Sequence, residues 1–540
     1  MHEGIAVALT PQEIAAGSLL DRSQKKPHSR VGFVVFGLVV LAGLIYAGSQ
    51  LAHDLSRVHT LTAWPYMLLG LALLIALGFE FVNGFHDTAN AVATVIYTNS
   101  LTPHVAVVWS GIWNLIGVLT SSGAVAFSIL SLLPVELVLH VDKGAGFTMV
   151  FALLIAAILW NLGTWWFGLP ASSSHTLIGS IIGVGIANQL MGVRSGISGV
   201  DWDQATTVFK VLLISPLVGF GCAALLLLVL KFAVRDPALY EAPKGDDPPP
   251  FWIRCLLILT CTGVSFGHGS NDGQKGMGLI MLILIGTVPT AYALNHAIGY
   301  DKVQDFAAVS QQSVRALDNY APPEADPADP RATLTEYIRT RQLTADTAPA
   351  LRQMIEQIES EVVMYKTLAN VPASQQQNVR NDMYIASESL RLMRKTGDPG
   401  FSSADAEVLT NYRGYLDNST KYIPTWVKVA VALALGMGTM VGWKRIVVTI
   451  GEKIGREHLT YAQGAAAGIV AAATIIGADN FHMPVSTTHV LSSGVAGSMS
   501  ANGSGLQMIT IRNIAMAWVF TLPAAALLAG SLFWLMRQFL

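Results

Sequence analysis

The stretch Gly84-Phe85-His86-Asp87-Thr88-Ala89-Asn90-Ala91 places a carboxylate in a long apolar run, and Gly269-Ser270-Asn271-Asp272-Gly273-Gln274-Lys275 repeats this arrangement later in the chain. Each is followed by a proline and a row of hydroxyl side chains, in Pro170-Ala-Ser-Ser-Ser-His-Thr176 and Pro484-Val-Ser-Thr-Thr-His-Val490. Matching polar clusters in two halves of an apolar chain are typical of secondary transporters with internal repeats.

The spacing of these paired elements differs between the two halves. The chain from Asp272 to Pro484 is much longer than the chain from Asp87 to Pro170. The excess is close to the length of one polar segment, 300–424, which holds a large share of the charged side chains. Amphipathic helical spacing within it predicts a small soluble helical insert. The insert is either a regulatory or dimer-contacting unit or a plain insertion without chemistry.

The composition indicates a membrane protein. The chain has 540 residues, of which 52% are hydrophobic and 13% charged, against about 25% charged in soluble domains. Apolar runs recur from residue 31 to the C-terminus, so we expect an all-α polytopic membrane protein embedded in the lipid bilayer. The formal net charge of −2 gives no reason to expect a nucleic-acid partner.

The apolar runs number about 12. They are 31–47, 65–82, 104–133, 147–168, 176–191, 207–232, 252–266, 276–294, 425–441, 464–478, 487–499 and 510–536. Several, notably 252–266 and 487–499, are too short to cross about 30 Å of hydrocarbon. Short segments beside the paired motifs predict re-entrant hairpins or broken helices around a central site in the two repeats, with each Asp in a glycine-rich break.

These features divide the chain into parts. The predicted boundaries are a polar segment 1–30, an extra helix and loop 31–64, a first repeat 65–232, a linker 233–251, the second repeat in two parts 252–299 and 425–540, and the insert 300–424 between them. The basic stretch before residue 31, the linker region and the loop 442–458 are expected in the cytoplasm, because cytoplasmic loops are enriched in Lys and Arg.

Asp87 and Asp272 are the sharpest chemical signal, since a carboxylate at membrane depth is normally paired or functional. We interpret them as the coupling-ion site, with Asn90, Asn271 and Gln274 supplying neutral oxygens and amides. The alternative is that each Asp caps a following half-helix.

The hydroxyl rows predict an anion site. Ser172, Ser173 and Ser174 in the first half and Ser486, Thr487 and Thr488 in the second each precede an apolar run, where a helix begins. Free backbone N–H groups, the positive end of the helix dipole and the hydroxyls then converge. The alternative is plain N-capping.

Histidines and one lysine accompany the motifs. His86, His175, His268 and His489 can relay a proton near neutral pH, or be buried structural residues. Lys275 can pair with Asp272 or touch the anion. No paired His/Cys/Glu spacing accompanies them, so we expect no bound metal and no cofactor.

The four motifs, in this order, resemble the inorganic phosphate transporter (Pit) family. The run 81–97 is especially similar to the bacterial proton-coupled branch. This resemblance implies two inverted repeats, re-entrant hairpins, a central phosphate site, a homodimer, and a multi-pass location in the plasma (inner) membrane of a bacterium. Many relatives have Gly-Ala-Asn-Asp where this chain has Gly84-Phe85-His86-Asp87, and the imidazole there suits proton coupling better than a sodium site. The bacterial branch also implies phosphate carried as a complex with a divalent metal.

The predicted function is therefore import of inorganic phosphate by proton symport, by a protein that is not an enzyme. Alternatives are a sodium-coupled phosphate carrier or a sulfate permease on the same fold, a passive anion channel, and, most remotely, a membrane enzyme acting on phosphate esters.

Overall fold

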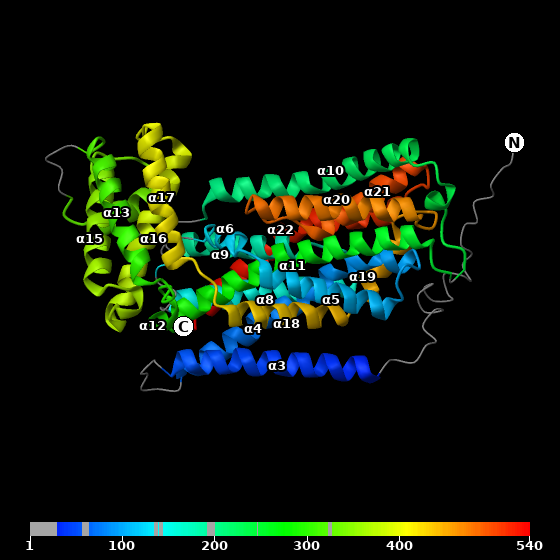
Figure 1. Ribbon diagram of the computed structural model, residues 1–540, viewed down its shortest axis with the longest axis horizontal. Coiled ribbons are helices and arrows are strands. Elements are labelled where there is room, and N and C mark those ends of the chain that lie inside the picture. The colour runs from blue at the N-terminus through cyan, green and yellow to red at the C-terminus, as the bar shows by residue number, and fades with distance from the viewer. Residues whose placement is uncertain are drawn as a thin grey trace.

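The computed structural model describes residues 30–56, 64–133, 139, 144–191, 200–245, 247–321 and 327–539. Within these ranges the chain is helical, and its one β contact is the isolated bridge between Gly455 and Leu506. The helices form an elongated bundle with a separate group of helices at one end (Figure 1). The predicted all-α class is confirmed, while the polar segment before residue 30 lies outside the described residues.

Eight helices of the described chain are long and apolar enough to cross a membrane, or nine if α17 (Ser403–Thr420) and α18 (Thr425–Met440), which meet at 71°, form one span. The eight are α3 (Arg30–Leu55), α4 (Trp64–Tyr97), α5 (Pro103–Thr120), α8 (Gly144–Trp166), α10 (Trp202–Ala233), α11 (Phe251–Thr287), α20 (Tyr461–Asn480) and α22 (Met508–Met536). The expectation of about 12 segments is not confirmed. One reason is that 252–266 and 276–294 both belong largely to the single helix α11.

The predicted glycine-rich breaks at Asp87 and Asp272 are wrong, because α4 and α11 continue through both motifs. The glycines serve close helix crossing instead, as small residues do between membrane helices. A Cβ on Gly84 would collide with the backbone of Leu435 in α18, and one on Gly269 with the backbone of Asn114 in α5. The two carboxylates therefore project from intact helices held against their neighbours.

Two helical hairpins carry the hydroxyl rows. In the first, α8 turns back into α9 (Ser173–Met191); in the second, α20 turns back into α21 (Thr487–Asn502). The connecting segments 167–172 and 481–486 hold the Pro-x-Ser elements. Helix α9 packs against α22, and α21 against α10. Both hydroxyl rows thus lie at helix N-termini, as predicted.

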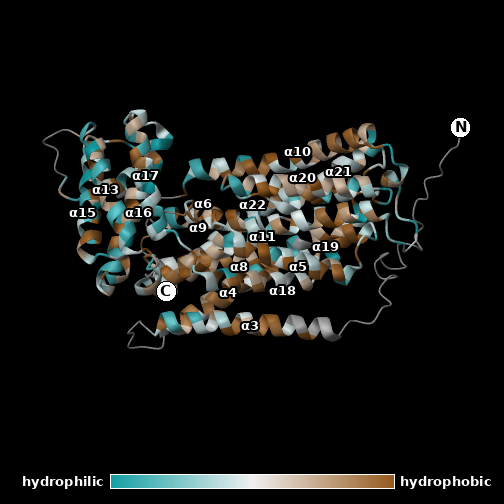
Figure 2. Cartoon of the chain, viewed as in Figure 1, coloured by the Kyte–Doolittle hydropathy of each residue, from teal (hydrophilic) through white to brown (hydrophobic). Residues whose placement is uncertain are grey.

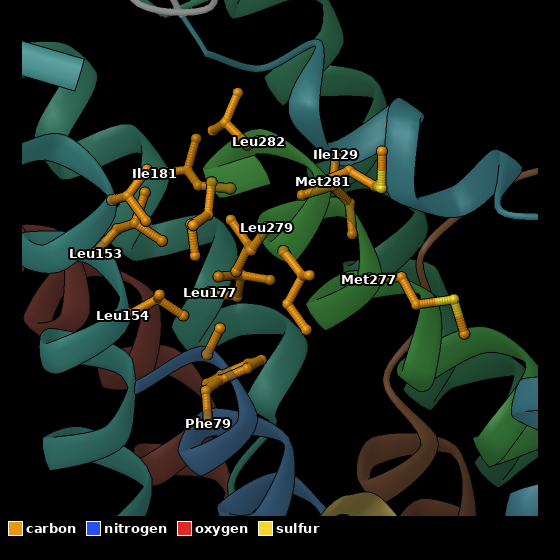
Figure 3. Close-up of a cluster of buried hydrophobic side chains, with 14 of the residues drawn as sticks. Phe79, Ile129, Leu153, Leu154, Leu177, Ile181, Met277, Leu279, Met281 and Leu282 are labelled. Carbon is orange, nitrogen blue, oxygen red and sulfur yellow. The ribbon is translucent and has the colours of Figure 1, made fainter. Parts of the chain in front are cut away.

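An apolar core holds the first hairpin against the helices that carry the two Asp motifs. Figure 3 shows Phe79 of α4, Ile129 of α6 (Ala124–Leu130), Leu153 of α8, Leu177 of α9 and Met281 of α11 gathered in one cluster of buried side chains. Burying such side chains together fixes these helices relative to one another. The start of α9 is thereby positioned beside α4 and α11.

The predicted insert region forms the separate group of helices. It contains α13 (Tyr300–Asp318), α14 (Pro330–Thr340), α15 (Thr347–Tyr365), α16 (Ala373–Thr396) and α17. These helices surround their own apolar core, which includes Leu351 and Tyr412. Hydrophilic residues cover them far more than they cover the bundle (Figure 2). This pattern is typical of a unit packed in water.

Asp201, immediately before α10, ties this unit to the bundle. Its Oδ2 lies 2.8 Å from Arg341 and 3.1 Å from Arg391, while Oδ1 accepts from the backbone N–H of Gln204 at 3.1 Å. Burial opposes ionisation of Asp201, but the two guanidinium groups and the N–H outweigh it, so the pKa of this carboxyl is lowered from its usual 3.8.

Candidate functional site

Asp87 lies where the two hairpins meet α4, and its side chain is buried. Oδ2 accepts a hydrogen bond from Ser173 Oγ at 2.5 Å, and Oδ1 accepts one from Thr488 Oγ1. Asn90 donates from its amide to Thr488 Oγ1 at 2.9 Å and to the Asp87 carbonyl at 2.7 Å. One carboxylate thus joins a hydroxyl from each hairpin.

Asp272 faces the same spot from α11 and is fully buried. The Lys275 ammonium lies 2.7 Å from its Oδ1, and Ser173 Oγ lies 3.4 Å from its Oδ2. Lys275, also buried, donates to Ser174 Oγ as well. The lysine therefore pairs with Asp272, which is one of the two roles predicted for it, and it also contacts the first hydroxyl row.

A cation-binding arrangement arises between these groups. His268 Nε2 lies 3.7 Å from Asp272 Oδ2, and its Nδ1 lies 2.7 Å from Asn114 Oδ1. One ligand atom each from Asp87, His268 and Asp272 falls within 4.8 Å of the others. Two carboxylates and an imidazole at this separation are able to hold a cation. The sequence predicts Asp87 and Asp272 as coupling-ion residues, and the structure adds His268, four residues before Asp272 on α11.

The hydroxyl rows divide into two kinds of contact. Ser172 Oγ accepts from the backbone N–H of His175 at 3.2 Å, and Ser486 Oγ accepts from that of His489 at 3.2 Å. These two serines therefore cap α9 and α21, as the N-capping alternative predicted. The His175 and His489 rings lie 4.4 Å apart between centroids, so the two helix N-termini lie close together.

Further polar atoms near the helix starts have no partner among the described residues. These buried atoms without a hydrogen-bond partner are Thr487 Oγ1, His175 Nδ1, His489 Nε2 and Asn90 Oδ1. Ser174 instead donates to the Val485 carbonyl at 2.9 Å. Buried polar groups without partners are uncommon in native proteins and often mark a ligand site.

The remaining predicted side chains lie around this centre. His86 Nδ1 is 3.4 Å from Asp87 Oδ1, and its Nε2 is 3.1 Å from Thr164 Oγ1. Asn271 and Gln274, predicted as coupling-ion residues, point to other partners. Asn271 bonds the backbone of the second hairpin's connecting segment, and Gln274 donates to Asp479 at 2.8 Å.

Sequence reasoning missed two acidic residues. Glu80 is fully buried on α4 and accepts from Asn83 at 3.3 Å, and a Cβ on Gly276 of α11 would collide with it. Asp479, at the end of α20, accepts from Ser270 Oγ at 2.5 Å. Glu80 is two helical turns before Asp87, so helical periodicity on α4 was the signal available for finding it.

The chain is similar to known proteins along most of its length. The model of the phosphate transporter family matches residues 83–529. The chain is 44% identical to the low-affinity inorganic phosphate transporter PitA of Escherichia coli (strain K12), over 88% of this chain and 97% of that protein. It is 43% identical to PitB of the same strain, over 87% of this chain and 97% of that protein. A solved structure of a sodium-dependent phosphate transporter covers 88% of this chain and all of its own, at 17% identity and a TM-score of 0.48.

The PitA and PitB relatives are bacterial, and the described chain has several helices able to span a membrane. The expected multi-pass location in a bacterial inner membrane is thereby confirmed. The family match and the E. coli relatives extend over most of the chain, including all four motifs from which the resemblance was drawn. The chain therefore belongs to the phosphate transporter (Pit) family.

Proposed function

We propose that the protein is a secondary active transporter that imports inorganic phosphate by proton symport. The observation that carries this proposal is the position of Asp87. Its carboxylate accepts hydrogen bonds from Ser173 and Thr488, one hydroxyl from each row. The same hydroxyls are donors that a phosphate bound between the helix N-termini would need.

This arrangement supplies a coupling mechanism. While Asp87 is ionised, it occupies the Ser173 and Thr488 donors and repels an incoming anion. A proton on Asp87 removes the negative charge and frees both hydroxyls to turn toward phosphate. Anion binding is thus favoured only after the proton has bound, which is the thermodynamic requirement for symport.

The remaining donors suit a tetrahedral oxyanion. The starts of α9 and α21 present backbone N–H groups and the positive ends of two helix dipoles. Thr487 offers a buried hydroxyl without a partner among the described residues, and Lys275 contributes one cation already shared with Asp272. Mostly neutral donors allow the anion to leave, as a carrier requires.

The cluster of Asp87, His268 and Asp272 favours a second form of the substrate, a complex of phosphate with a divalent metal. These residues can hold the divalent cation of a metal–phosphate complex beside the anion donors. The cation would then be cargo. If the cation is cargo, phosphate uptake falls when EDTA replaces Mg²⁺, and His268→Ala raises the Mg²⁺ concentration needed for half-maximal uptake.

The test is uptake of radiolabelled phosphate into proteoliposomes under a pH gradient, a sodium gradient or neither, with sulfate as competitor. We expect accumulation with the pH gradient alone. Asp87→Asn mimics the protonated carboxyl, so it should retain phosphate exchange and lose proton-driven accumulation. Accumulation driven by sodium would overturn the proton assignment, and equilibration under every gradient would favour the passive channel.

Sulfate and ester substrates are separated in the same preparation. Protonated phosphate donates a hydrogen bond that sulfate lacks, and an ionised carboxylate such as Asp272 is able to accept it. Strong competition by sulfate would therefore favour the permease alternative. Release of phosphate from esters by the purified protein would contradict a transporter without enzymatic activity.

A further inference from the structure

The two hairpins differ at one pair of matching positions. When the repeated motifs are aligned, Asp87 on Asp272 and Pro170 on Pro484, Phe85 corresponds to Ser270 and Trp165 to Asp479. In both halves the two side chains are in contact, between the Asp-bearing helix and the end of the first helix of the hairpin. The chemistry of that contact is apolar in one half and polar in the other.

In the first half, aromatic rings close the contact. The Phe85 and Trp165 ring centroids lie 5.2 Å apart with edge-to-face geometry, and the Arg445 guanidinium stands 4.7 Å above the Trp165 ring. Trp165 Nε1 donates to the Gly442 carbonyl at 2.7 Å. Such a contact stays closed in water, because opening it exposes apolar surface.

In the second half, hydrogen bonds to a carboxylate close the contact. Asp479 accepts from Ser270 Oγ at 2.5 Å and from Gln274 Nε2 at 2.8 Å. Asn271 adds a bond to the Met483 carbonyl at 3.0 Å, in the connecting segment. Asp479 itself is half-buried, and the adjacent Phe481 is 75% exposed. Water can therefore replace these bonds when the hairpin separates from α11.

The contacts of the loops place the Phe85–Trp165 contact and the Ser270–Asp479 contact at opposite faces of the membrane. Helix α20 begins at the face of the inter-repeat linker, where Tyr461 N–H donates to the Glu241 carbonyl. The insert lies at the other end of the bundle, to the left in Figure 1. The linker and the loop 442–458 carry the basic residues expected in the cytoplasm. The α20–α21 hairpin thus enters from the cytoplasmic face, and its tip covers the site from the insert face.

We propose that the α20–α21 hairpin is the extracytoplasmic gate of the transporter and that Asp479 is its latch, released when Ser270 and Gln274 exchange the carboxylate for water. The aromatic contact of Phe85 with Trp165 keeps the cytoplasmic side closed in the same state. Gln274 also accepts from the Val125 N–H of α6 at 3.0 Å, so the latch position is fixed by a third helix. This proposal deepens the proposed function, since it supplies the route by which phosphate reaches the site.

The first test measures access without phosphate. In a background with Cys222, Cys255 and Cys261 replaced by Ser, Val485→Cys places a thiol at a position that is 1% exposed and whose backbone N–H donates to Asn271 Oδ1. A membrane-impermeant maleimide is added from either side of oriented vesicles. Asp479→Asn replaces one acceptor oxygen by an amide donor, so labelling from the insert face should accelerate about tenfold, as expected for loss of a hydrogen bond to a charged group.

The control is Asp203→Asn, which neutralises an exposed carboxylate near the insert without contacting the hairpin; its side chain is 67% exposed. Labelling should not accelerate in this variant. Unchanged labelling in Asp479→Asn, or acceleration from the cytoplasmic face, would overturn the gate.

A second measurement locks the latch. Ser270→Cys with Asp479→Cys, joined by a short cleavable bifunctional thiol reagent, should lose phosphate uptake and regain it after reduction. Full uptake by completely cross-linked protein would refute the gate. If the unmodified protein moves no phosphate, the proposed function fails, and the maleimide assay still decides the gate by itself.

Discussion

Lys275 offers the most direct test of the electrostatics of the site. It is a buried ammonium whose charged partner in the described structure is Asp272, at 2.7 Å, with both side chains inaccessible to solvent. Lys275→Met keeps most of the side-chain volume and removes the charge. Asp272 is then left as a buried carboxylate without its cation, and removing one partner of a buried pair costs about 3–5 kcal/mol.

The assay is unfolding in mixed micelles of increasing denaturing-detergent fraction, which gives the free energy of unfolding of each variant. A double variant, Lys275→Met with Asp272→Asn, removes both charges. We expect it to regain most of the lost stability, because a neutral pair of similar volume is often as stable as a buried ion pair. Both the single and the double variant should lose phosphate transport.

The coupling between the two substitutions is the decisive quantity. If Lys275→Met alone unfolds at the same detergent fraction as the unaltered chain, the pair carries no ionic interaction. Stability losses that simply add in the double variant would lead to the same conclusion, since residues in contact should show a coupling of about 0.5–3 kcal/mol.

Three further predictions concern packing, anion binding and pH. Gly84→Ala should cost about 1–3 kcal/mol of unfolding free energy by overpacking against the α18 backbone, whereas Gly70→Ala, with open space around it, should cost nothing measurable. Thr487→Val should raise the KM for phosphate about tenfold by removing one of the anion's hydrogen-bond donors, with stability unchanged. Ser486→Ala should instead lose about 1 kcal/mol of stability, because Ser486 caps α21. The pKa of Asp201 is lowered on folding, so its contribution to stability is present above pH 3.8 and lost as pH falls below it. Across this pH range, the free energy of unfolding should therefore fall less steeply in Asp201→Asn than in the unaltered chain.

The positions of the hydroxyl rows were predictable because their local signal matches what the fold requires. A proline followed by Ser or Thr before an apolar run marks a helix N-terminus, and α9 and α21 begin at Ser173 and Thr487. The continuity of α4 and α11 was not predictable in this way. Glycine at Gly84 and Gly269 suggested breaks, whereas its role is to admit the backbones of Leu435 and Asn114, which only tertiary structure reveals.

Some of the candidate site residues could likewise be predicted from the sequence and others could not. Asp87 was found because Asp272 repeats its motif, and the structure brings both to Ser173. Asp479 has no such repeat, since its counterpart in the first half is Trp165. Gln274 was assigned to the ion site because it is close to Asp272 in sequence. On a helix, however, side chains two residues apart point to different faces. Repetition thus identifies what the halves share and hides what distinguishes them.

The charge balance of the centre indicates how many cations would neutralise it in the proposed symport. Asp87 and Asp272, both ionised, against Lys275 leave one net negative charge when the imidazoles are neutral. Dihydrogen phosphate adds a second, and uncompensated charge in a buried site costs several kcal/mol. In the proposed symport, complete neutralisation of the loaded site would take two cations with that anion, and an ionised Glu80 would raise the number by one. In the proposed mechanism a neutral metal–phosphate complex brings its own compensation, so a single proton on Asp87 suffices, and His268 and Asp272 remain to hold the metal. The donor hydroxyls that this proton frees are the ones the complex needs, which makes the neutral complex the substrate form with the lowest electrostatic cost.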